Sequence, residues 1–76
     1  MVKLLFAEDD RDLNRAVTAL LRRDGYDVDA VFSGTDALDK GIADQYDGMV
    51  LDWMLPGMDG LTVLRELRES GVQTPC

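Results

Sequence analysis

The sequence predicts an α/β fold built around a parallel sheet. Three short apolar runs, near residues 2–7, 26–31 and 49–51, alternate with segments in which apolar residues recur at helical spacing. Strands that alternate with helices along a chain form parallel sheets with right-handed crossovers. Acidic residues directly follow the first and third runs, at the edge where such sheets bind ligands. The predicted order is β-α-β-α-β-α, in one domain over residues 1–76.

The first strand and helix are predicted over residues 2–7 and 11–23. The strand segment is almost continuously apolar, which is typical of a strand buried on both faces. Asp9 or Asp10 can cap the helix, and Gly25 suits the position after its last turn. One apolar stripe of this helix is formed by Leu13, Ala16, Val17, Leu20 and Leu21.

The second strand and helix follow directly. Residues 26–31 alternate apolar and acidic side chains, so one face is wetter and the segment is predicted to be an edge strand. Ser33 and Asp36 resemble a capping box in which Asp stands in the place of Glu. Gly41 weakens the helix prediction that follows. One side of this helix would be formed by Ala37, Leu38 and Ile42.

The third strand is predicted at residues 49–51. Pro56 and Gly57 favour a loop after it. A third helix then ends at Gly71, and residues 72–76 resemble the approach to a fourth strand. The apolar positions of the third helix are Leu61, Leu64 and Leu67.

Composition bounds the class of protein. The chain has 76 residues, 46% of them apolar, which fits one small globular domain. Fifteen acidic against eight basic residues give a net charge of −7, which argues against binding to a nucleic-acid backbone or an anionic membrane. One cysteine cannot form an internal disulfide, and no run resembles a signal or membrane-spanning segment. We expect a cytoplasmic, reducing setting.

Carboxylates at two strand ends predict a metal site with a nucleophile. Glu8 and Asp9 follow the first strand, and Asp52 follows the third. In a flavodoxin-like strand order of 2-1-3, one half of a doubly wound sheet with three layers, these two strands are neighbours. Like charges in one crevice repel each other unless a cation neutralises them, and Mg²⁺ prefers such oxygen ligands. The Asp52 carboxylate could then attack phosphorus and form an acyl phosphate.

Simpler roles are open to each acidic group. The acids at residues 8–10 can serve as helix caps and dipole partners, and Asp52 alone can be a turn residue. Asp59 is expected to cap the third helix rather than to bind a metal. The residues themselves do not decide whether Glu8 or Asp10 is the partner of Asp9.

The residue pattern resembles the receiver domain of bacterial two-component response regulators over all 76 residues, and is similar to the subgroup that is fused to a winged-helix DNA-binding domain. The resemblance implies that Asp52 is the phosphoacceptor and that Glu8 and Asp9 are the acidic pair for Mg²⁺. It further implies the backbone carbonyl of Met54 as a metal ligand. Phosphate would come from a histidine kinase or a small phosphodonor. The runs that carry it are Leu4-Leu5-Phe6-Ala7-Glu8-Asp9-Asp10, Gly25-Tyr26, Tyr46-Asp47 and Leu51-Asp52-Trp53-Met54-Leu55-Pro56-Gly57-Met58-Asp59-Gly60.

Receivers normally continue with a hydroxyl residue after strand four and a lysine after strand five, whereas this sequence ends at Cys76. We therefore expect a truncated receiver without strands four and five or the DNA-binding effector, with residual Mg²⁺ binding and weak or absent phosphorylation. The third strand would have an unpaired edge, which recruits other strands. We expect a homodimer of strand order 2-1-3-3′-1′-2′, with Cys76 either free or in a disulfide across the dimer.

Three other classes of protein compete with this interpretation. A haloacid-dehalogenase-type phosphatase would place a second Asp at the position of Met54, so we expect no enzyme. The acids do not follow the EF-hand ligand series, which argues against a calcium loop. The stronger alternative is a structural, self-associating fragment without a live phosphoacceptor site.

Overall fold

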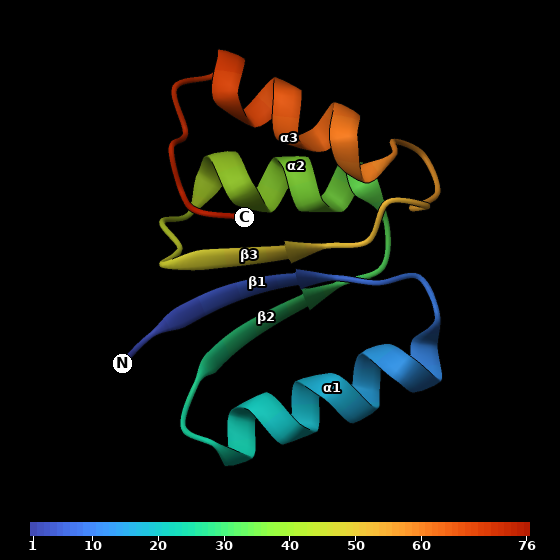
Figure 1. Ribbon diagram of the computed structural model, residues 1–76, viewed down its shortest axis with the longest axis vertical. Helices are drawn as coiled ribbons and strands as arrows, with labels where there is room; N and C mark the ends of the chain where they lie inside the picture. Colours follow the sequence, from blue (N-terminus) through green and yellow to red (C-terminus); the bar gives the residue numbers. More distant parts are fainter.

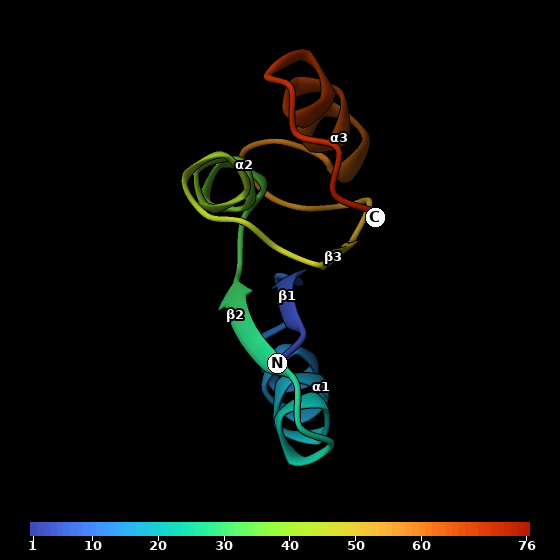
Figure 2. The same ribbon diagram turned by 90° about the vertical axis from the view of Figure 1, so that its left-hand side faces the viewer.

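The computed structural model describes all 76 residues and contains the predicted elements in the predicted order. The sheet is parallel, has the strand order β2-β1-β3, and consists of β1 (Lys3–Ala7), β2 (Asp27–Val31) and β3 (Gly48–Leu51). One helix covers one face of the sheet and two lie on the other (Figures 1 and 2), namely α1 (Arg11–Arg23) against α2 (Gly34–Ala43) and α3 (Gly60–Glu69). The predicted flavodoxin-like α/β arrangement in three layers is confirmed.

The main core lies between the sheet and the pair α2 and α3. Gly41 lies inside α2, and a Cβ atom there would come within 2.7 Å of the Leu67 side chain of α3 and 3.2 Å of Met49. The glycine that weakened the helix prediction therefore allows α3 to pack closely against α2. Burying an aliphatic core side chain contributes about 1.5–3 kcal/mol. The buried core residues are Leu5, Ala7, Val31, Ala37, Tyr46, Met49, Leu55, Val63 and Leu67.

The apolar stripe predicted for α1 is only partly buried, because Val17 and Leu21 are half-buried and the rest is exposed. Leu13 and Leu20 are 49% and 51% exposed, whereas Asn14 and Thr18 face the sheet and are almost completely buried. The Asn14 side-chain amide donates to the carbonyl of Val31 at 2.9 Å, and Thr18 donates to the Asn14 side chain at 3.2 Å. Buried backbone carbonyls at the ends of the strands have no partner in the sheet and need other donors. The buried polar side chain of Asn14 on α1 provides such a donor.

The helix ends follow the sequence signals. The three N-caps are Asp10, Ser33 and Asp59, and each side chain accepts a hydrogen bond from the backbone N–H three residues later. Gly25 and Gly71 follow α1 and α3 with φ angles of +98° and +87°, a conformation that favours glycine. None of the three helices combines the length and the apolar character needed to cross a bilayer.

The two edges of the sheet differ. At the β2 edge, the Arg22 guanidinium donates to the Val28 carbonyl at 2.8 Å. At the β3 edge, the C-terminal residues return beside the strand (Figure 2), and the Met49 N–H donates to the Pro75 carbonyl at 2.9 Å. The expectation that the third strand has no neighbour is therefore wrong at its first residues.

Beyond this contact, β3 and α3 border an apolar groove of about 340 Å³. Val50, Trp53 and Leu61 are 50%, 67% and 47% exposed there. The groove is lined by Met49, Val50, Leu51, Trp53, Gly60, Leu61, Leu64 and Cys76.

Candidate functional site

Three carboxylates meet at the carboxyl edge of the sheet. Glu8 and Asp9 follow β1 and Asp52 follows β3, and one oxygen atom of each lies within 4.8 Å of the others. The strand ends are held together because the Asp52 N–H donates to the Ala7 carbonyl at 3.1 Å. Asp10 caps α1, so Glu8 is the residue that joins Asp9 in the cluster. The predicted convergence of acidic groups from two strand ends is confirmed.

Residue 8 is held by hydrogen bonds on three sides. The Glu8 N–H donates to the Val31 carbonyl at 3.2 Å, and the Glu8 carbonyl accepts from the Asn14 amide at 3.0 Å. The Asp10 N–H donates to Glu8 Oε1 at 3.1 Å, which orients the carboxylate itself. Asn14 was not predicted from the sequence as part of the site, although a polar residue one turn into the helix that follows the acidic run was the available signal.

The electrostatics of the cluster are visible at Glu8. The hydrogen bond from the Asp10 backbone lowers the pKa of Glu8, but desolvation, the negative charge of Asp52 and side-chain hydrogen bonds with Asp52 and Asp9 outweigh it, and the pKa lies above its ordinary value. Like charges in contact favour the protonated form. A bound cation would reverse this effect because it favours the charged form of each ligand.

No basic side chain compensates the cluster. The structure contains one ion pair, between Lys3 and Asp29, and it lies elsewhere on the sheet. Arg11 follows the acidic run, but its guanidinium stacks over the Phe32 ring at 4.5 Å. Three carboxylates without a cationic partner, two of them half-buried and one exposed, form a donor set that fits a hard cation which keeps part of its water shell.

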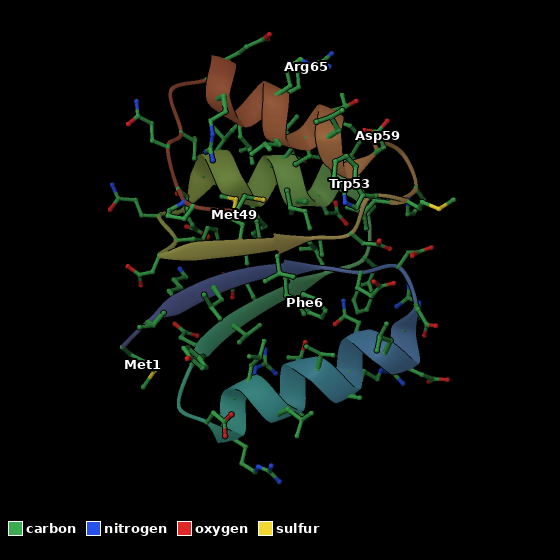
Figure 3. The ribbon with its side chains drawn as sticks, in the orientation of Figure 1. Met1, Phe6, Met49, Trp53, Asp59 and Arg65 are labelled. Atoms are coloured by element: carbon green, nitrogen blue, oxygen red, sulfur yellow. The ribbon has the colours of Figure 1, made fainter.

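The loop after Asp52 carries the remaining predicted ligand. The Met54 side chain is 83% exposed, and the Leu55 side chain is buried in the core. Trp53 lies at the end of β3 near the start of α3, where Asp59 forms the cap (Figure 3). Trp53 lines the apolar groove and is adjacent in sequence to Asp52, so its fluorescence can report on the site.

The sequence profile of the response regulator receiver domain matches residues 4–76. The chain belongs to the response regulator receiver family. This receiver is 43% identical over 74 residues to the transcriptional regulatory protein DltR of Streptococcus agalactiae, an alignment that covers 97% of the chain and 33% of DltR. The chain therefore spans about a third of the length of the curated relatives that it matches.

Solved structures agree with this receiver over most of its length. A receiver domain of a Francisella response regulator superposes with a TM-score of 0.94 at 33% identity, covering 99% of the chain and 62% of that structure. The receiver domain of the Pseudomonas aeruginosa sensor histidine kinase PA1611, solved with magnesium in its active-site cleft, gives 0.86 at 32% identity and coverages of 90% and 56%. The complex of Thermotoga maritima histidine kinase ThkA with response regulator TrrA gives 0.87 at 30%, covering 97% and 64%.

Proposed function

We propose that this chain is the phosphoacceptor part of a two-component response regulator. Asp52 accepts the phosphoryl group, and Mg²⁺ is held by the carboxylates of Glu8, Asp9 and Asp52 together with the backbone carbonyl of Met54. The observation that carries the proposal is the cluster of three carboxylates within 4.8 Å, at the ligand-binding edge of the sheet, without a basic partner. The chain is a phosphate acceptor in this proposal and not an enzyme with turnover.

The chain contributes a positioned nucleophile. Asp52 is half-buried, and its backbone is fixed to β1 by the hydrogen bond to Ala7, so its carboxylate oxygen can be aligned with an incoming phosphorus atom. As the bond from this oxygen to phosphorus forms, the bond from phosphorus to the donor breaks and the leaving group departs with the electron pair. Bound Mg²⁺ supplies charge neutralisation for the carboxylates and the phosphoryl oxygens.

The proposed partners rest on the relatives. The ThkA–TrrA complex supports a sensor histidine kinase as the phosphate donor, and the magnesium in the PA1611 receiver supports Mg²⁺ as the metal. DltR is a transcriptional regulator, which supports control of transcription as the output of the longer protein. DNA would be contacted by a winged-helix effector domain and not by these residues, because their net charge of −7 opposes binding to a phosphate backbone.

Mg²⁺ titration monitored by Trp53 fluorescence and by calorimetry tests the site. We expect saturable binding by the wild-type chain and loss of binding in Asp52→Asn. Asp39→Asn removes an exposed acid of α2 outside the cluster and serves as the matched control with unchanged binding. Equal Mg²⁺ affinity in both variants would contradict the proposed metal site. Incorporation of phosphate from a small phosphodonor into the longer protein, absent in its Asp52→Asn variant, tests the acceptor role, and the chain of 76 residues is expected to incorporate little or none.

We also infer that the β3 edge pairs with a second copy of this chain. Hydrogen-bonding groups alternate along a strand, so the Leu51 N–H faces the same outer side as the Met49 N–H. The groove above it has no charged residue, although the chain carries a net charge of −7. Two copies can therefore meet there with little electrostatic repulsion, and the exposed apolar edge favours strand pairing.

Sedimentation equilibrium at micromolar concentration tests the dimer. Val50→Lys places a charge at the β3 edge and should give a monomer, whereas Leu13→Lys changes an equally exposed apolar residue of α1 and should leave the dimer intact. A compact wild-type monomer would refute the dimer. The expectation of a Cys76 disulfide is tested on the same samples by non-reducing gel electrophoresis.

A further inference from the structure

The loop that follows Asp52 is attached to the start of α2. The Gly34 N–H donates to the Pro56 carbonyl at 3.0 Å. The first N–H groups of a helix have no partner within the helix, so the loop carbonyl satisfies one of them. One residue further along each segment, Gly57 adopts φ +80° and packs against Thr35, whose Oγ1 would lie 3.2 Å from a Cβ on Gly57. The β2–α2 and β3–α3 connections therefore form one contact, at the carboxyl edge of the sheet (Figure 1).

Gly34 leaves no room for a side chain at this contact. A Cβ atom on residue 34 would overlap the carbonyl oxygen of Met58 and lie 2.5 Å from its carbonyl carbon. Both atoms belong to the backbone, so no side-chain rotation relieves the overlap. Alanine has the higher helix propensity, yet here any residue larger than glycine must displace the loop or the helix. The position has a packing requirement that comes from the loop and not from α2.

The loop has two further anchors. The Gly60 N–H donates to the Trp53 carbonyl at 3.1 Å, and a Cβ on Gly60 would overlap the Asp52 carbonyl oxygen. The Leu55 side chain is buried in the core. Met54 lies between these anchored neighbours, so its backbone is restrained although its side chain is exposed.

We propose that Gly34 is a positioning residue for the metal site. Its N–H and its lack of a side chain hold residues 53–58 in place, and this keeps the Met54 carbonyl fixed relative to the carboxylate cluster. The inference rests on the proposed function, in which that carbonyl is a ligand. A ligand that is already ordered loses less conformational entropy on binding the metal, and residues that orient metal ligands typically change affinity 10- to 100-fold when they are replaced.

The test compares two glycines of α2. Gly34→Ala introduces the overlap with the loop, whereas Gly41→Ala introduces a contact with the Leu67 side chain in the core, away from the loop. We expect the Mg²⁺ dissociation constant, measured calorimetrically at a temperature where both variants are folded, to rise about tenfold in Gly34→Ala. It should stay within about twofold of wild type in Gly41→Ala. A purely structural role would lower the unfolding temperature without this selective loss of affinity, so a folded Gly34→Ala with wild-type affinity would overturn the proposal.

A second readout separates this inference from the proposed function. In metal-free protein, Gly34→Ala should accelerate amide hydrogen exchange at Gly60 about tenfold or more, because the anchor at the other side of the loop opens, and Gly41→Ala should not. If the wild type does not bind Mg²⁺, the proposed function fails and the exchange result still decides whether Gly34 holds the loop. Should Gly34→Ala not fold, Thr35→Ala removes the contact with Gly57 without adding an atom, and unchanged exchange at Gly60 in that variant would contradict the proposal.

Discussion

Towards the amino end of the sheet, Asp29 and Asp47 have partners within the chain. The Tyr46 hydroxyl donates to Asp29 at 2.7 Å, and the Lys3 ammonium lies 3.9 Å from the same carboxylate. The Lys3 backbone N–H donates to Asp47 at 2.7 Å, and the Lys3 ammonium also lies 5.1 Å from the centre of the Tyr46 ring. Lys3 compensates the charge of Asp29, and a backbone N–H holds the Asp47 carboxylate, so these contacts link neighbouring segments on that side of the sheet.

At the carboxyl end, Glu8, Asp9 and Asp52 approach one another without such compensation. These acidic residues are held in place by backbone hydrogen bonds and by neutral groups such as the Asn14 amide. Because these partners carry no positive charge, the negative charge of the carboxylates remains available to a ligand. Acidic residues at a sheet edge therefore indicate a binding site only where the chain does not neutralise them. Four substitutions or ligand effects test this difference between the two ends of the sheet.

The largest effect is expected from Asn14→Ala. This change removes the donor to two carbonyls, of Glu8 and Val31, and leaves buried polar groups unsatisfied. We expect a loss of about 3 kcal/mol in the free energy of unfolding, together with weaker Mg²⁺ binding. Chemical denaturation with and without Mg²⁺ measures both. A loss below about 0.5 kcal/mol would mean that the carboxyl end is not organised by this amide.

Mg²⁺ itself should stabilise the chain through the carboxyl end alone. At a free concentration of 100 times the dissociation constant, binding to the native state adds about 2.7 kcal/mol. The same increment is expected in Asp29→Asn, because that residue belongs to the compensated end, and it should disappear in Asp52→Asn. Thermal unfolding with Mg²⁺, and with Na⁺ at equal ionic strength, makes the comparison. An increment lost in Asp29→Asn would end the distinction between the two ends.

A smaller effect is expected from Tyr46→Phe at the compensated end. The hydroxyl hydrogen bond to Asp29 contributes about 1 kcal/mol. Desolvation, the hydrogen bond to Asp29 and nearby negative charge raise the pKa of Tyr46 above its ordinary value. Because the folded pKa is the higher one, this contribution is complete below about pH 10 and is lost as the pH rises towards the folded pKa. The stability difference between wild type and variant should therefore be constant near neutral pH and shrink in alkali, with Mg²⁺ binding unchanged at pH 7.

The smallest effect is expected from Asp59→Ala, which stands beside the cluster in sequence but only caps α3. The hydrogen bond donated by the Thr62 backbone N–H, followed by the one donated by the Thr62 side-chain hydroxyl, lowers the pKa of Asp59. A lowered folded pKa means that the cap stabilises the protein above the ordinary Asp pKa and loses this contribution as the pH falls through the folded value. The stability lost in Asp59→Ala should thus be present at pH 7 and vanish in acid. Mg²⁺ affinity that fell with it would show that Asp59 belongs to the site.

Much of the fold could be predicted because its signals are local. The bounds of α1, Arg11–Arg23, agree with the prediction because Asp10 and Gly25 mark its ends through hydrogen bonds and φ angles of nearby residues. The strand order was predicted from the flavodoxin-like fold type, and the meeting of Glu8, Asp9 and Asp52 followed because the first and third strands are then neighbours that end at one edge.

The parts that were not predicted depend on contacts between distant segments. Asn14 is buried because carbonyls of Glu8 and Val31 require its amide, and helical periodicity cannot show this. Gly41 weakened the helix prediction, whereas its role is set by Leu67 of a later helix. Gly34 contacts the Met58 backbone across two loops, and neither loop carries a sequence signal for this contact.

The guanidinium of Arg22 on the Val28 carbonyl has a consequence for assembly. It occupies an acceptor that an incoming strand would need, and Asp27 beside it adds negative charge at the same border. Copies that join through β3 in a two-fold arrangement would present only these protected borders to the solvent. Assembly through sheet edges should therefore stop at two copies, and this polypeptide should resist polymerising into extended ribbons or fibres.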